Sequence, residues 1–108
     1  LDLADDGLRQ YHPDLAIDSE GLVLLVWIDE AEGDQILYAR YNPSTSQIEE
    51  KFPLTNQEAY WMRPSIEADA FGNLYVVWEE DISASEGDIW FATTRTSDPS
   101  AVRSWMDY

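Results

Sequence analysis

The stretch "GLVLLVWIDE" at 21–30 places seven consecutive apolar side chains, Leu22 to Ile28, in a strongly acidic chain. A strand with one face in water alternates apolar and polar residues, because successive side chains point to opposite faces. A run that is apolar on both faces therefore predicts a strand covered by a layer on each side. A second run of this kind, "GNLYVVWEE" at 72–80, indicates that the arrangement occurs twice.

These two runs belong to an internal repeat. The segment "HPDLAIDSEGLVLLVWIDE" aligns with "RPSIEADAFGNLYVVWEED", and the matched residues are 51 positions apart: Pro13 and Pro64, Asp18 and Asp69, Gly21 and Gly72, Val26 and Val77, Trp27 and Trp78. Further on, "EGDQILYAR" aligns with "EGDIWFATT", which pairs Gly33 with Gly87 and Asp34 with Asp88. The offset grows to 53 or 54, and this predicts a longer loop, "DISASEGD", in the second copy.

Each copy predicts four short strands. The first spans 13–18 or 64–69 and alternates, the second is the apolar run, and the third spans 35–41 or 88–94. The fourth, at 47–54, is expected to place Ile48, Phe52 and Leu54 on one side. The sequence therefore predicts an all-β chain of two four-stranded antiparallel units, with the first unit at 1–55 and the second at 56–108. β-Propeller blades have this form, and a two-sheet β-sandwich is the alternative.

Composition excludes several classes of partner. The chain has 108 residues, 22 acidic against 6 basic side chains, and a formal charge of −16. Neutralising nucleic-acid phosphates or an anionic membrane surface needs clustered Lys and Arg, so we expect neither nucleic acid nor membrane as a partner. Cysteine is absent, so disulfides and thiolate metal sites are not available.

The repeated pattern Pro-x-(Ile/Leu)-x-x-Asp-x-x-Gly-x-(Val/Leu)-x-x-Val-Trp-x-(Asp/Glu), followed by Gly-Asp, resembles the blades of sialidase-like (BNR-type) β-propellers. The family's Asp-box turn is matched only loosely, at Ser97, Asp98 and Trp105, and is not taken as a site. Propellers of this family are often secreted or at the cell surface, and this gives only a weak indication of location.

The resemblance also says what a sialidase would need: three arginines around a carboxylate, a tyrosine paired with a glutamate, and an acidic proton donor. The spacing of the arginines in this chain does not predict such a triad. These arginines are Arg9, Arg40, Arg63, Arg95 and Arg103. We therefore expect no enzymatic activity, but a binding or assembly scaffold. The alternatives are a fragment of a sialidase-like glycoside hydrolase and a carbohydrate-binding, lectin-like propeller.

The two ends of the chain predict an assembly edge. Leu1 and Leu3 align with the end of a fourth strand, and Trp105 and Tyr108 align with the beginning of one. Residues 1–3 would then complete a neighbouring blade. We expect head-to-tail association of copies, in which three chains give six blades or four give eight, or else further blades in a parent polypeptide.

Two sets of residues are candidate ligand sites. Calcium prefers several oxygen ligands, and the loops after the apolar runs offer six carboxylates: Asp29, Glu30, Asp34, Glu80, Asp81 and Asp88. Solvated acidic surface is the alternative interpretation, and no other cofactor is expected. Tyr60 and Trp61 lie in the connection between the two units, where they would stack on a sugar or contact a partner, or else pack against the adjacent sheet.

Overall fold

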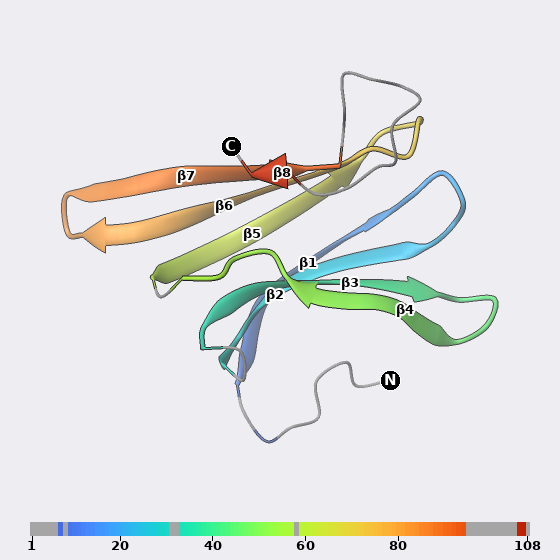
Figure 1. Cartoon of the computed structure of the whole chain (residues 1–108), viewed down its shortest axis with the longest axis horizontal. Coiled ribbons are helices and arrows are strands. Elements are labelled where there is room, and N and C mark those ends of the chain that lie inside the picture. The colour runs from blue at the N-terminus through green and yellow to red at the C-terminus, as the bar shows by residue number, and fades with distance from the viewer. Residues whose placement is uncertain (1–6, 8, 31–32, 58, 95–105, 108) are drawn as a thin grey trace.

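The computed structural model describes residues 7, 9–30, 33–57, 59–94 and 106–107, which form two antiparallel β-sheets and no helix (Figure 1). The first sheet has the order β1 (Gln10–Ile17), β2 (Val23–Asp29), β3 (Gln35–Asn42) and β4 (Gln47–Pro53). The second has β5 (Tyr60–Ala68), β6 (Leu74–Ser83) and β7 (Glu86–Thr93), with the two-residue β8 (Met106–Asp107) beside β7. The prediction of an all-β chain is confirmed.

The two sheets repeat each other in register as well as in sequence. Val26 of β2 lies opposite Tyr38 of β3, and their counterparts Val77 and Phe91 lie opposite each other in β6 and β7. The first strands, β1 and β5, also contain a register shift at equivalent places: just before Asp14 in β1 and just before Ser65 in β5. The internal repeat therefore determines the pairing of strands and not merely their composition.

Each sheet has two faces, because alternate residues of a strand point to opposite sides and directly paired residues share a side. The leading face carries Leu15, Ile17, Leu25 and Trp27 in the first sheet and Ile66, Ala68, Val76 and Trp78 in the second. The trailing face carries Ala16, Leu24, Val26, Ile28, Ile36 and Tyr38 in the first sheet and Glu67, Tyr75, Val77, Glu79, Ile89 and Phe91 in the second.

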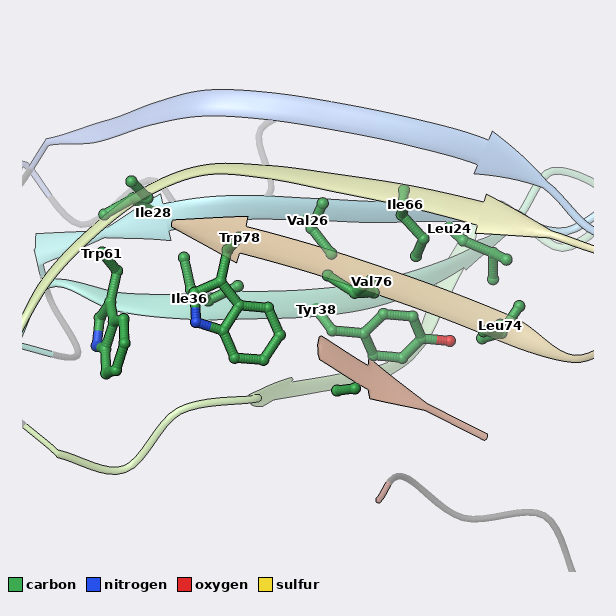
Figure 2. Close-up of a cluster of buried hydrophobic side chains, with 11 residues drawn as sticks. Leu24, Val26, Ile28, Ile36, Tyr38, Trp61, Ile66, Leu74, Val76 and Trp78 are labelled. Atoms are coloured by element: carbon green, nitrogen blue, oxygen red, sulfur yellow. The ribbon is translucent and has the colours of Figure 1, made fainter. Parts of the chain in front are cut away.

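The main core lies between the trailing face of the first sheet and the leading face of the second. Strand β5 lies against β1 and β2, so that the second sheet covers the first (Figure 1). Figure 2 shows side chains from both sheets filling this space, and the buried set comprises Leu24, Val26, Ile28, Ile36, Tyr38, Trp61, Ile66, Leu74, Val76, Trp78 and Ala92. Burial of an aliphatic or aromatic side chain contributes roughly 1.5–3 kcal/mol, so this interface dominates the stability of the fold.

The leading face of the first sheet carries a second, smaller core. Trp27, Leu37 and Ala39 are buried there, with Leu25 packed against them. The Lys51 ammonium lies 6.0 Å from the centre of the Trp27 ring. Strand β2 is therefore buried on both faces over its central residues, which accounts for the uninterrupted apolar run at 22–28.

Equivalent turns join the first two strands of each sheet. Gly21 and Gly72 adopt φ of 82° and 81°, a conformation that glycine adopts without steric cost. Ahead of them, Asp18 accepts hydrogen bonds from the amides of residues 20 and 22, and Asp69 accepts them from residues 71 and 73, all at 2.9 Å. Asp69 also accepts bonds from the Asn73 side chain and the Tyr75 hydroxyl, and these bonds, that from Asn73 foremost, lower its pKa to about 2.

A carboxylate links the two sheets at their first strands. Asp14 of β1 accepts hydrogen bonds from the Ile66 amide at 2.9 Å and from Ser65 Oγ at 3.2 Å, both in β5. Ile66 is paired with Val76 of β6, and β5 is a border strand of its sheet. Asp14 therefore gives this border strand an acceptor on the side of β1, and it fixes β5 against β1.

Two details of the predicted strands are wrong. The segment expected as a long loop in the second copy is instead a hairpin, in which β6 runs to Ser83 and β7 starts at Glu86. Asp88 consequently lies within β7, opposite Glu80. In β4 an irregularity at Arg40 of its partner strand shifts the pairing, so that Ile48 lies opposite Tyr41 while Phe52 lies opposite Tyr38. Ile48 and Phe52 therefore point to opposite faces.

Candidate functional site

The acidic residues at and after the end of β2 do not converge on one point. Asp29 is 1% exposed and accepts hydrogen bonds from Trp27 Nε1 at 3.0 Å and from Gln10 Nε2 at 3.5 Å. Glu30 accepts a bond from the Arg9 amide at 3.1 Å. Asp34 is exposed and adopts φ of 59° in the turn before β3. Asp29 is thus a buried acceptor that orients an indole ring.

The corresponding residues of the second sheet do not converge either. Glu80 accepts a hydrogen bond from Trp90 Nε1 at 2.9 Å, while Asp81 and Asp88 are exposed on the β6–β7 hairpin. Among the residues that the structure describes, no three His, Cys, Asp or Glu side chains are placed to hold a metal ion. The hypothesis of a calcium site therefore has no supporting geometry in the described part of the chain.

Tyr60 and Trp61 are neighbours in sequence but differ completely in burial. The Tyr60 side chain is 78% exposed, whereas Trp61 is 3% exposed. Trp61 meets Trp78 and Trp90 edge to face, with ring centres 6.4 and 5.7 Å away, and its Nε1 donates to the Gln57 carbonyl oxygen at 3.2 Å. Trp61 is therefore a core residue, and of the two predicted ligand-binding aromatics only Tyr60 presents a ring to solvent.

Tyr60 borders a hollow that also contains Asp34. The hollow has a volume of about 400 Å³ and is lined by Gly33, Asp34, Ala59 and Tyr60. Its walls come from the turn before β3 and from the start of β5, so one residue of each predicted set lines the same hollow. Burial and, after it, the charge of Asp34 raise the pKa of the nearby Tyr11. An open aromatic ring beside a carboxylate suits a polyhydroxylated ring, which stacks and donates hydrogen bonds.

A second hollow, of about 380 Å³, lies where β1 and β5 are irregular. It is lined by three equivalent pairs: His12 and Arg63, Pro13 and Pro64, Asp14 and Ser65. His12 and Arg63 adopt φ of 54° and 48°, although residues with side chains seldom do so. The Arg63 Nε lies 3.1 Å from Glu79 Oε2 in an exposed ion pair. The sequence showed that His12 and Arg63 are equivalent, but nothing in it indicated their left-handed backbone.

The predicted assembly edge, Leu1, Leu3, Trp105 and Tyr108, lies outside the described residues. No helix within the described ranges is long and apolar enough to cross a membrane. No family model, no curated protein and no solved structure matches this chain.

Proposed function

We propose that this chain is a non-enzymatic repeat module of the β-propeller blade type, which serves as a binding or assembly scaffold. The observation that carries the proposal is the packing of two equivalent sheets through unlike faces, the trailing face of one on the leading face of the next. Such a contact is heterologous, so each sheet that it adds presents a further trailing face to the next. Propeller blades follow one another around a ring in this way.

The arrangement of the strands also supports blades over a sandwich. Each sheet is a four-stranded meander, and the sheets are linked by hydrogen bonds at their first strands, through Asp14. First strands that approach one another are expected around the central axis of a propeller. A two-sheet sandwich would instead bury one face of each sheet and leave the other face polar.

The assignment of a non-enzymatic role draws support from the arginines in the described residues. Arg40 contacts Glu49 and Glu50, Arg63 contacts Glu79, and Arg9 lies over the Tyr11 ring at 4.7 Å. Each is engaged in a different place, so these three do not form the cluster that a sialidase-like hydrolase requires.

Self-association is the direct test of the scaffold. We expect light scattering to give a mass of about 37 kDa for a ring of three 12.4 kDa chains, or about 50 kDa for a ring of four. Further repeats within a longer polypeptide would supply the same neighbours inside one molecule. A single 12.4 kDa species at all chain concentrations would contradict self-association.

Carbohydrate binding is the second candidate function, and the open ring of Tyr60 beside Asp34 favours it. We expect calorimetric titration with a panel of neutral mono- and disaccharides to find a ligand that Tyr60→Ala binds about tenfold more weakly, because a stacking contact is lost. Phe71→Ala is the matched control, since Phe71 is 80% exposed but lies in the turn between β5 and β6. Equal affinities of the wild type and Tyr60→Ala would exclude this site.

A further inference from the structure

Several equivalent pairs have one member buried between the two sheets and the other open to solvent. On the leading face, Ile66 of the second sheet is 2% exposed, whereas its counterpart Leu15 in the first sheet is 57% exposed. Ile17, beside Leu15 on the same face, is 55% exposed. The first sheet thus exposes apolar residues at positions that the second sheet buries.

The trailing faces show the reverse asymmetry. Val26 and Ile36 of the first sheet are fully buried, whereas their counterparts in the second sheet, Val77 and Ile89, are 42% and 73% exposed. The counterparts are identical in residue type, Val for Val and Ile for Ile. The open trailing face of the second sheet therefore keeps the side chains that, in the first sheet, make the buried contact.

We infer that the trailing face of the second sheet docks on the leading face of the first sheet of another copy of this chain. In this contact Val77 of one copy faces the Leu15 side of the leading face of the next. Ile89 lies at the other end, toward Trp27, because its counterpart Ile36 lies beside Trp78 and away from Ile66 (Figure 2). The inference rests on the proposed function and deepens it, because it assigns the two surfaces and their polarity. The occupant is a second copy because the required partner surface is already present, in matching form, on the same chain.

The trailing face of the second sheet carries a carboxylate at two positions where that of the first sheet is apolar. Glu67 and Glu79 of the second sheet stand where the first sheet has Ala16 and Ile28. Burying a carboxylate is unfavourable unless it is paired, and only for Glu79 does the structure give a partner, Arg63 at 3.1 Å. The contact between copies is therefore weaker than the internal interface, and it associates reversibly.

Two single substitutions test the polarity. Ile89→Glu places a charge on the trailing face, and Leu15→Glu places one on the leading face. Both replace exposed residues, so we expect the fold to be retained, and circular dichroism checks this. We expect each variant alone to associate about a hundredfold more weakly in sedimentation equilibrium, because a carboxylate would be buried unpaired. Phe71→Glu is the control: Phe71 lies on neither face and its counterpart in the first copy is Glu20.

Mixing the two variants gives the sharpest result. Ile89→Glu keeps an intact leading face and Leu15→Glu keeps an intact trailing face, so the mixture should form a dimer of about 25 kDa that does not extend. A symmetric contact between like faces would not be restored by mixing. In the opposite direction, Glu67→Ala with Glu79→Ile should tighten the association relative to the wild type, because it removes both carboxylates from the contact.

The outcomes separate this inference from the proposed function. If the wild type associates and both glutamate variants associate equally well, the assigned surfaces are wrong although the scaffold remains. If mixing restores nothing while each variant is monomeric, the head-to-tail polarity is wrong. If the wild type itself stays at 12.4 kDa, both the inference and self-association fail.

Discussion

Replacing Trp61 with alanine is expected to lower the free energy of unfolding by about 3–5 kcal/mol, which is much of the total stability of a small domain. Trp61 lies at the start of β5 and is buried against Trp78 and Trp90. Its indole also donates a hydrogen bond to the Gln57 carbonyl oxygen, in the segment that connects the two sheets. The substitution removes a large buried side chain and leaves a cavity between sheet and connection.

The neighbouring residue provides a matched control. Tyr60→Ala removes an aromatic ring of similar size from the adjacent position, but that ring is 78% exposed. Its effect should stay within about 0.5 kcal/mol. Urea unfolding monitored by circular dichroism at one fixed chain concentration measures both values. Equal losses in the two variants would show that Trp61 does not occupy the core.

Thr55→Val is expected to cost about 1–3 kcal/mol, although valine has nearly the shape of threonine. The Thr55 hydroxyl lies just beyond the end of β4 and accepts a hydrogen bond from the Ile36 amide at 3.0 Å. It also donates a hydrogen bond to the side-chain oxygen of Gln35. Both partners are buried, so valine would leave a backbone donor and an amide oxygen without a partner and without water.

Thr55→Ser separates the hydroxyl from the methyl group. Serine keeps the donor and acceptor, so most of the stability should return in the same urea experiment. Beyond the end of β4, the Leu54 amide still donates to the Ile36 carbonyl oxygen at 2.7 Å. The Thr55 hydroxyl accepts from the amide of the same residue, Ile36, and so extends the β3–β4 pairing. Equal losses for serine and valine would assign the effect to packing of the methyl group.

Periodicity and repetition were sufficient to predict much of the fold. The uninterrupted run at 22–28 correctly indicated a strand buried on both faces, because both faces of β2 carry core residues. The 51-residue offset predicted which residues are equivalent, and the strand pairings respect it, as with Val26 and Val77. These features are local or repeated, and they depend on the pattern of side chains along the chain.

Features that depend on how one sheet meets the other were not predictable. The side chains of Tyr60 and Trp61 point to opposite faces of β5, as those of neighbours in a strand do. Only the packing of β5 on the first sheet decides that the Trp61 side is the buried one. The meeting of Tyr60 and Asp34 in one hollow likewise depends on the placement of two sheets. The long loop expected in the second copy was wrong because its residues continue the β6–β7 ladder, which satisfies more backbone groups than a loop would.

The composition of β4 has a consequence for solubility. β4 is the outermost strand of the first sheet, and it carries Glu49, Glu50 and Lys51 in its middle and Pro53 at its end. Charged side chains and proline on a border strand discourage a foreign strand from adding to it, and so they oppose fibril growth. The β4 border of the first sheet is thereby closed to strand addition, so association of copies through their sheet faces would not extend into cross-β stacking at this border.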